Sequence, residues 1–308
     1  MPELTVVMAC YNAMPYLPAA VQSIRDQTLT DWEMVIVNDG SSDHSPAYLH
    51  EVAGLDSRIR VLDQENLGQQ AAANRGIAAA RTDLIARMDA DDIAEPERFE
   101  KQLNFMRLRP DVGLLGGQIR RLGKQRSGME SSFPTEHDQI VDHLLKNRHA
   151  ICNPTVILRK SLFERIGGYW EHNIAEDWDL FLRMGEVSRL ANLRDLILSY
   201  RFHTGSINGR RIVEAQLYNE FAAELAIRRA NAQQPMGFHE FLSSHRSRRW
   251  PMSWLFYFDS QSIGQYREAI AEIYSGNPLV GYARLGLSAA MSPGRTIRRL
   301  GNMARRWS

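Results

Sequence analysis

The sequence lacks the usual features of a secreted or membrane-spanning protein. It has only two cysteines, Cys10 and Cys152, which lie far apart and belong to no CxxC pair, so neither a disulfide framework nor a structural zinc site is supported. No uninterrupted apolar run approaches the ~20 residues needed to span a bilayer. Met1-Pro2-Glu3 lacks the basic segment that begins a signal peptide. These absences predict a cytoplasmic protein with reduced thiols, either soluble or peripheral on the inner face of the membrane.

Net charge is also nearly absent, at +1, but its distribution is uneven. Residues 210–308 hold 14 Lys/Arg against 7 Asp/Glu, and residues 1–209 hold 23 against 29, which gives +7 and −6. This asymmetry predicts two parts, residues 1–209 and a helical region at 210–308, with different partners. The last segment, Arg295 to Ser308, carries five arginines and is expected to attract phosphate groups. No nucleic-acid partner is predicted.

The 308 residues, 44% of them hydrophobic, suffice for a sizeable core. Short apolar runs at 4–9, 33–37 and 84–88 are typical of buried strands, and helical patterns at 16–27 and 66–80 lie between them. Strands that alternate with helices through short links pair in parallel with right-handed crossovers. The sequence therefore predicts an α/β fold with a Rossmann-like, mostly parallel sheet flanked by helices.

Polar residues follow each of these three runs. Tyr11 and Asn12 follow the first, Asp39 follows the second, and an acidic group at 89–92 follows the third. The carboxyl ends of strands in doubly wound sheets meet at one crevice, so these side chains are expected to converge. Neighbouring carboxylates raise one another's cost of ionisation, and a divalent cation relieves it. The alternative is a solvated acidic turn, with Asp92 or a neighbour as the N-cap of a helix that has Pro96 in its first turn.

The second half of the chain has weaker patterns. Residues 116–136 predict an antiparallel excursion or a mobile flap, and strands are expected at 153–159 and 196–203. A helix near 175–184 has acids in its first turn, which either complement the helix dipole or include a general base. Helices are expected at 213–231 and 266–291, separated by Pro/Gly breaks and an aromatic segment.

Taken together, the motifs resemble those of the inverting glycosyltransferases of family 2, which have the GT-A fold. The resemblance spans residues 4–206 and keeps the family's motif order. The motifs are Val7 to Asn12, Ile36 to Asp43, Asn66-Leu67-Gly68, Asn74-Arg75-Gly76, Arg87 to Asp92, Gly167-Gly168-Tyr169 and Glu176-Asp177. A lone DxD is a weak signal, but the ordered set is strong.

The resemblance implies a nucleotide-diphosphate-sugar donor, most simply a UDP-sugar, and a Mn²⁺ or Mg²⁺ ion. It implies transfer to an acceptor hydroxyl with inversion, on a glycan or lipid-linked acceptor of cell-envelope polysaccharide or glycoconjugate synthesis. Asp91 matches the direct metal ligand, and Asp89 matches the acid that contacts the ribose or a metal-bound water. Asp39 would accept a hydrogen bond from the base imide, with Tyr11 and Asn12 beside the nucleoside.

Further roles follow from the same resemblance. Asp177 matches the catalytic base, and Glu176 is expected to orient it or to touch the acceptor. His203 resembles the family's histidine near the metal, although an isolated histidine carries little information. Many members have an arginine where this chain has Ala73, so the diphosphate contact is expected from Arg75 or Arg87.

Two further arginines are candidate phosphate contacts. They are Arg183 and Arg201, and for Arg183 the alternative is an i,i+4 ion pair with Asp179.

Three alternatives remain open from the sequence. A nucleotidyltransferase would also use strand-end aspartates and a metal, but it should carry a Gly-rich basic loop after its first strand, which is absent at residues 11–15. A non-catalytic nucleotide-sugar-binding protein would keep the same fold. The C-terminal segment either docks on a membrane surface or packs as an ordinary amphipathic helix on the preceding helices.

Overall fold

The computed structural model describes residues 2–122, 127–170, 175–201, 212–249, 253–275, 277–294 and 296. The chain divides into two compact units, residues 1–121 with 129–201, and residues 122–128 with 202–308. The domain boundary expected at 209/210 falls within 202–211, which lies outside the described residues.

In the described chain, nine strands form one sheet in the order β3-β2-β1-β4-β8-β6-β9-β5, and β7 pairs with β6. The strands are β1 (Leu4–Cys10), β2 (Trp32–Asp39), β3 (Ile59–Gln64), β4 (Leu84–Asp89), β5 (Ile93–Ala94), β6 (Val112–Leu122), β7 (Ser127–Glu130), β8 (Ile157–Arg159) and β9 (Arg189–Arg201). β3, β2, β1 and β4 are all parallel, whereas β8 runs antiparallel to both β4 and β6. The predicted α/β class with a mostly parallel sheet is confirmed.

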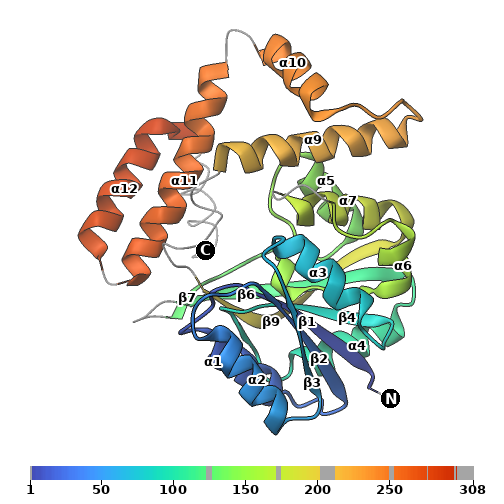
Figure 1. Cartoon of the computed structure of the whole chain (residues 1–308). Helices are drawn as coiled ribbons and strands as arrows, with labels where there is room; N and C mark the ends of the chain where they lie inside the picture. The colour runs from blue at the N-terminus through green and yellow to red at the C-terminus, as the bar shows by residue number, and fades with distance from the viewer. Residues whose placement is uncertain are drawn as a thin grey trace. The chain divides into compact units, whose positions relative to one another are not determined.

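Helices cover both faces of this sheet (Figure 1). They are α1 (Leu17–Arg25), α2 (Ser45–Leu55), α3 (Gln69–Ala78), α4 (Arg98–Leu108), α5 (His137–Leu145), α6 (Lys160–Arg165) and α7 (Glu176–Val187), with a 3-10 turn at Asn153–Thr155. Side chains alternate between the faces of a strand. Val6 and Met8 therefore join the core that includes α1, α2 and α4, whereas Val35 and Val37 pack with Ala72 of α3.

Helix α3 lies very close to the sheet. A Cβ added at Gly76 would lie 2.5 Å from Cγ1 of Val7 in β1, a distance that real side chains do not reach. Glycine at position 76 therefore permits the close helix-on-sheet packing that the alanine-rich sequence predicted. This packing sets the start of α3 beside the carboxyl ends of β1 and β2.

Sequence reasoning missed α2 and α5 and misplaced two boundaries. The strand expected at 153–159 is a 3-10 turn followed by the short β8, because Pro154 lacks the N–H that a strand ladder requires. The excursion expected at 116–136 contains the second half of β6 and the paired strand β7, while residues 123–126 lie outside the described residues.

The second unit contains four described helices, α9 (Ile212–Ala230), α10 (Phe238–Arg249), α11 (Ser253–Ser275) and α12 (Pro278–Met291). Stacked rings of Tyr218 and Phe238, with centroids 4.1 Å apart, join α9 to α10. The predicted helix at 213–231 is confirmed. The single helix predicted at 266–291 is wrong, because Pro278 occupies the first turn of a separate helix and α11 already starts within the aromatic segment.

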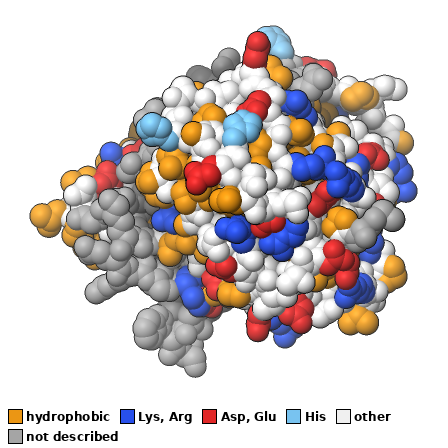
Figure 2. Space-filling view, turned by 60° about the horizontal axis from the view of Figure 1, so that its bottom comes forward, with side chains coloured by type: hydrophobic (Ala, Val, Ile, Leu, Met, Phe, Trp, Pro, Cys, Tyr) orange, Lys and Arg blue, Asp and Glu red, His pale blue; other side chains and the backbone are white. Residues whose placement is uncertain are grey.

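In the described part of the chain, no helix combines the length and apolar character needed to cross a membrane. Most of the basic C-terminal segment, at 295 and 297–308, lies outside the described residues. On the face shown in Figure 2, Lys and Arg side chains are interspersed with Asp and Glu among the coloured residues.

Candidate active site

Three neighbouring parallel strands bring the predicted residues to one edge of the sheet. In the register of the sheet, Cys10 of β1 lies opposite Asn38 of β2, and Ala9 lies opposite Asp89 of β4. Neighbouring strands are about 4.8 Å apart, so the ends of β2 and β4 are separated by about 10 Å across β1. Asp39 and Asp89 thus flank the end of β1, at the edge where the sequence predicted that they would meet.

Acids from two distant parts of the chain share one electrostatic environment. The pKa of Asp89 is raised to about 6, chiefly by burial, with Arg87 opposing the rise and the charges of Asp91 and Asp177 contributing to it. Burial also raises the pKa of Glu176 to about 7, with repulsion from Asp177 and Asp89 acting in the same direction. The carboxyl end of β4 and the first turn of α7 therefore form one acidic cluster.

Arg87 lies beneath this cluster and is fully buried. Its Nη2 lies 3.5 Å from Oδ1 of Asp89, and its Nη1 donates a hydrogen bond of 3.0 Å to the carbonyl of Val7. Its guanidinium also faces the ring of Tyr169, 5.9 Å from the centroid. The prediction that Arg87 contacts the diphosphate is corrected here, because a side chain with no exposed surface cannot touch a ligand in this arrangement. Arg87 instead holds Asp89.

A second buried arginine, Arg98 of α4, supports the same region. Its Nη2 donates a 2.8 Å hydrogen bond to the carbonyl of Arg87, and its Nε donates to Gln102. Burial lowers the pKa of Arg98 to about 9, and nearby Asp92 opposes that change. Arg98 is not predictable from the sequence as part of the site, because one arginine on an amphipathic helix has the pattern of a solvated charge.

Asp92 is not the N-cap of α4, which is Glu97. The Asp92 carboxyl is 1% exposed, and its Oδ1 accepts a 2.8 Å hydrogen bond from the backbone N–H of Arg201. Its Oδ2 has no hydrogen-bond partner among the described residues. Burial, followed by the charges of Asp91 and Asp89, raises the pKa of Asp92 well above its ordinary value. Asp92 is the third acid of the loop after β4, and its hydrogen bond with Arg201 therefore connects this loop to the end of β9.

The remaining arginines considered as phosphate contacts have internal partners. Arg183 forms the i,i+4 ion pair with Asp179, and it also donates to the carbonyls of Ile166 and Gly168. This confirms the alternative interpretation of Arg183, in which it pairs with Asp179. Arg201 donates a 2.8 Å hydrogen bond from Nε to the carbonyl of Asp91.

Asn12 fastens the loop after β1 to the loop after β2. Its Oδ1 accepts hydrogen bonds of 2.8 and 3.2 Å from the backbone N–H groups of Ser42 and Asp43, and its own N–H donates to Ser41 Oγ. Asn12 has a left-handed backbone, with φ of +47°, a conformation that asparagine tolerates better than most residues. Tyr11, which precedes it, is 53% exposed and available to a ligand.

Asp39 is 3% exposed and organises the start of α3. Its Oδ1 accepts hydrogen bonds from Gln64 Nε2 at 2.7 Å and from the N–H of Leu67 at 2.9 Å. Its Oδ2 accepts one from the N–H of Gly68 at 2.9 Å. A carboxylate offers about four acceptor positions, and the described residues occupy three of them. Arg75 is exposed and donates to the Gln64 side chain at 3.2 Å, on the side of Asp39 rather than within the acidic cluster.

Two sequence motifs join behind the cluster. Asn74 of α3 donates to the carbonyl of Tyr169 and accepts from its N–H, at 3.2 and 3.0 Å. Gly168, with φ of +73°, makes the turn that presents this backbone to Asn74. The hydroxyl of Tyr169 donates to Asn153 Oδ1 at 3.1 Å. The motifs of Asn74 and Tyr169 therefore support Arg87 from behind, and they do not form a second set of ligand contacts.

Comparison with known proteins supplies the decisive observation. The sequence profile of Glycosyl transferase family 2 matches residues 5–167, which is more than half of the chain. The chain belongs to this family. The prediction of a glycosyltransferase is thereby confirmed at the level of the family, and the matched region runs from β1 through the acidic loop to the turn at Gly167.

Curated glycosyltransferases share about 30% identity with the chain. The O-antigen biosynthesis glycosyltransferase WbnJ of Escherichia coli is 30% identical over 208 residues, covering 66% of this chain and 81% of WbnJ. The amylovoran biosynthesis glycosyltransferase AmsE of Erwinia amylovora is 30% identical, covering 67% and 79%. An uncharacterized glycosyltransferase of Haemophilus influenzae is 29% identical, and the aligned part is 66% of each chain.

Solved structures of low identity share the fold. S. aureus TarS 1-349 in complex with UDP-GlcNAc aligns with a TM-score of 0.63 at 15% identity, over 96% of this chain and 92% of TarS. The mannosyltransferase PcManGT from Pyrobaculum calidifontis, in complex with GDP-Man and Mn²⁺, aligns with a TM-score of 0.56 at 16% identity, over 88% and 87%. These alignments confirm the GT-A-type fold.

The acidic cluster fits a divalent cation in charge and in donor type. Five carboxyls, of Asp89, Asp91, Asp92, Glu176 and Asp177, interact with the three guanidinium groups of Arg87, Arg98 and Arg201. Fully ionised, this set carries two excess negative charges, which one divalent ion would balance. Carboxylate oxygens suit Mg²⁺ and Mn²⁺.

The protein alone does not complete the coordination of an ion in the described part. No group of three or more His, Cys, Asp and Glu side chains there is arranged to hold a metal. Mg²⁺ sites often use one or two carboxylates together with the phosphates of the substrate. The described residues fit an ion of that kind. His203, predicted as a further ligand, lies outside the described residues.

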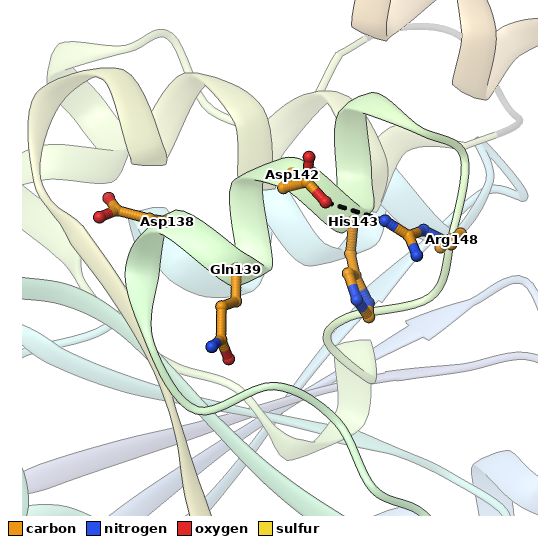
Figure 3. A pocket seen from close by; sticks show the side chains of 5 residues that line it. All are labelled: Asp138, Gln139, Asp142, His143 and Arg148. Carbon is orange, nitrogen blue, oxygen red and sulfur yellow. Dashed lines mark hydrogen bonds and ion pairs between the residues drawn. The ribbon is translucent and has the colours of Figure 1, made fainter. Parts of the chain in front are cut away.

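A hollow of about 460 Å³ lies beside α5 (Figure 3). It is lined by Asp138, Gln139, Asp142, His143 and Arg148. Arg148 already pairs with Asp142 at 2.8 Å. None of the family motifs reaches this hollow, so it is a surface depression beside a helix and not the catalytic centre.

Replacing Arg87 with methionine tests the support beneath the cluster. We expect Arg87→Met to lower the free energy of unfolding by about 3–5 kcal/mol, because it leaves Asp89 as an uncompensated, largely buried charge. Urea unfolding followed by circular dichroism measures this. Adding Asp89→Asn should recover part of the loss. The exposed pair of Arg107 and Glu3 provides the control, since Arg107→Met should cost at most about 1 kcal/mol. Equal costs at the two positions would contradict the role of Arg87.

Proposed function

We propose that this chain transfers a sugar from a nucleoside-diphosphate donor, a UDP-sugar, to an acceptor hydroxyl with inversion at the anomeric carbon. The observation that carries the proposal is the single acidic cluster formed by the end of β4 and the start of α7, at the same sheet edge as Asp39. The relatives in O-antigen and amylovoran biosynthesis favour a glycan or lipid-linked acceptor of the cell envelope. We also propose that this sugar transfer takes place in the cytoplasm.

Asp177 is the proposed general base. In an inverting displacement, the acceptor oxygen attacks the anomeric carbon, its proton passes to the base, and the bond to the diphosphate breaks as that group leaves with the electron pair. Oδ1 of Asp177 accepts a 2.9 Å hydrogen bond from the N–H of Trp178, which fixes the carboxylate at the first turn of α7. The positive end of the helix dipole favours the ionised form of a carboxylate there.

Glu176 is proposed to orient the base and the acceptor. Because its pKa is raised to about 7, Glu176 carries a proton for part of the time near neutral pH. A protonated Glu176 donates a hydrogen bond and adds no negative charge next to Asp177. The neutral form of Glu176 therefore lessens the repulsion that Asp177 experiences in a crowded acidic site.

The donor is proposed to lie across the ends of β1 and β2. Tyr11 is exposed there and can pack against a base, while a fourth acceptor position on Asp39 suits an imide N–H. Arg75 lies next to Gln64, which contacts Asp39, so it is proposed to contact the donor on the nucleoside side.

Asp91, with Asp89 beside it, would hold the Mn²⁺ or Mg²⁺ ion together with the donor phosphates, and His203 remains a predicted further ligand. A bound divalent ion supplies Lewis-acid stabilisation of the charge that develops on the departing diphosphate. The protein's own contribution is the placement of Asp89, through Arg87 below it, and of the Asp91 backbone, through Arg201.

A donor screen tests this function. We expect one nucleoside-diphosphate sugar to raise the melting temperature in the presence of Mn²⁺, since a ligand at ~100 times its Kd stabilises a protein by ~2.7 kcal/mol. The same donor with EDTA should give a smaller shift, and slow donor hydrolysis should require the metal. A nucleotidyltransferase would instead release pyrophosphate from a nucleoside triphosphate. Binding without hydrolysis or transfer would indicate a non-catalytic protein. Absence of a shift with every donor would overturn the proposal.

A further inference from the structure

The helix that carries the proposed base, α7, begins without the usual cap. Its N-cap residue is Ala175, which has a left-handed backbone with φ of +58° and gives the first turn no side-chain hydrogen bond. A residue with a Cβ adopts this conformation at a cost in energy, and alanine lacks the oxygen with which serine or aspartate caps a helix. Such backbone conformations persist where surrounding contacts hold them. Contacts other than a cap must therefore set the position of Asp177.

The side chain of Trp178 makes such a contact. It is 4% exposed, and its Nε1–H donates a hydrogen bond of 3.1 Å to the carbonyl of Leu144. Leu144 lies in the last turn of α5, a helix that packs against α7 (Figure 1). The ring of His149 meets the indole edge-on, with the ring centroids 5.5 Å apart. The first turn of α7 is therefore joined to the end of α5.

The backbone of Trp178 holds the proposed base. Its N–H donates the 2.9 Å hydrogen bond to Oδ1 of Asp177. The same residue is thus bonded to α5 through its side chain and to the carboxylate through its backbone. A second contact fixes the same turn, because Asp179 pairs with Arg183, which donates to the carbonyl of Gly168. The turn with the acids is held by these two tethers in place of a cap.

We propose that Trp178 is a positioning residue for Asp177. The hydrogen bond from its indole to α5 keeps the Asp177 carboxylate at the place where the acceptor oxygen gives up its proton. This inference rests on the proposed role of Asp177 as general base. A displacement of about 1 Å in a reacting group can lower a rate by about 100-fold. Trp178 acts only through Asp177 and has no part in binding the donor.

Replacing Trp178 with phenylalanine tests the inference, because an aromatic ring remains while the indole N–H is lost. The Leu144 carbonyl still accepts a 3.0 Å hydrogen bond from the N–H of Asn147, so the variant is expected to fold. The probe is the UDP-sugar chosen by the donor screen, with Mn²⁺ and with water as the acceptor. We expect Trp178→Phe to lower the rate of UDP release by about 10- to 100-fold. Calorimetric titration should show a donor affinity within about twofold and an unchanged stoichiometry, which excludes loss of folded protein.

Trp32→Phe is the matched control. Trp32 is 2% exposed, and its Nε1 has no hydrogen-bond partner among the described residues. It lies at the start of β2, at the opposite end of that strand from Asp39. The same chemical change at this position should leave the rate of UDP release within about twofold. Equal losses in Trp32→Phe and Trp178→Phe would overturn the inference.

A double variant separates positioning from a general structural effect. Adding Trp178→Phe to Asp177→Asn should lower the remaining rate by less than about twofold, because a residue that acts only through the base has no further effect once the base is gone. Losses that multiply in the double variant, or an unchanged rate in Trp178→Phe, would overturn the inference and leave Asp177 as the base. A full rate in Asp177→Asn, or no UDP release by the unaltered chain, would overturn the proposed function and the inference together.

Discussion

Asp177→Asn is expected to lower the kcat of sugar transfer by about 10²- to 10⁴-fold while donor affinity changes by less than about twofold. The size of the loss is that of removing a general base from the reaction. Asparagine has the same shape as aspartate, and its carbonyl oxygen can still accept the hydrogen bond from the N–H of Trp178. The first turn of α7 should therefore keep its structure, and only the ability to take a proton is lost.

Initial-rate kinetics and donor titration by calorimetry separate the two effects. Glu186→Gln is the matched control, because it removes an exposed carboxylate from the other end of the same helix. It should leave kcat within about twofold. Retention of full transfer activity by Asp177→Asn would refute the assignment of the base. A parallel loss of donor affinity would place Asp177 in donor binding instead.

Asp91→Asn should lower kcat/KM and metal-dependent donor binding, whereas Asp177→Asn should lower kcat. We expect kcat/KM to fall by about 100-fold or more, because a neutral amide holds a divalent ion less well and Lewis-acid stabilisation is worth several kcal/mol. Metal-dependent donor binding should fall with it, whereas donor binding measured in EDTA should change little. Counted with every group ionised, the substitution also reduces the excess negative charge of the cluster from two to one.

Titration of Mn²⁺ at fixed donor concentration measures the effect of Asp91→Asn. Asp138→Asn, at an exposed carboxylate of α5, serves as the control and should retain the metal dependence of the unaltered protein. The informative result is the difference in donor affinity between the Asp91→Asn and Asp177→Asn variants. If the two active-site variants lost donor affinity equally, the division of roles between the end of β4 and the start of α7 would be wrong.

The strands that carry the site were predictable because their physical signal is local. The apolar runs of β1, β2 and β4 are short, continuous and bounded by polar residues, and parallel pairing follows from the helices between them. The shared edge of Asp39 and Asp89 then follows from topology alone. The family motifs, in order, were sufficient to predict the family.

The parts that failed depend on tertiary contacts or on weak local signals. Helix α2 has a nearly uniform distribution of apolar residues, so its periodicity gives little indication of a buried face. The helix predicted across Pro278 shows the opposite error, in which apolar periodicity outweighed a proline that cannot lie inside a helix.

The site residues also divide into those that local sequence patterns predict and those whose roles depend on tertiary contacts. The sequence places Arg87 beside an acidic loop, but only the fold reveals that it points to the carbonyl of Val7 and has no exposed surface. Likewise, the three hydrogen bonds of Asp39 come from residues 25 to 29 positions away. Local sequence patterns do not encode such partners, so the role of each charged residue becomes clear only once its long-range contacts are known.

Arg201 is the last residue of the first compact unit. Its backbone N–H and its guanidinium are both bonded to the loop after β4, through the Asp92 carboxyl and the Asp91 carbonyl. The polypeptide thus leaves this unit from a point anchored twice to the acidic loop. Shortened or chimeric versions of the enzyme must retain Arg201 to keep that loop fastened, and the first position at which foreign sequence can be joined without removing either anchor is residue 202.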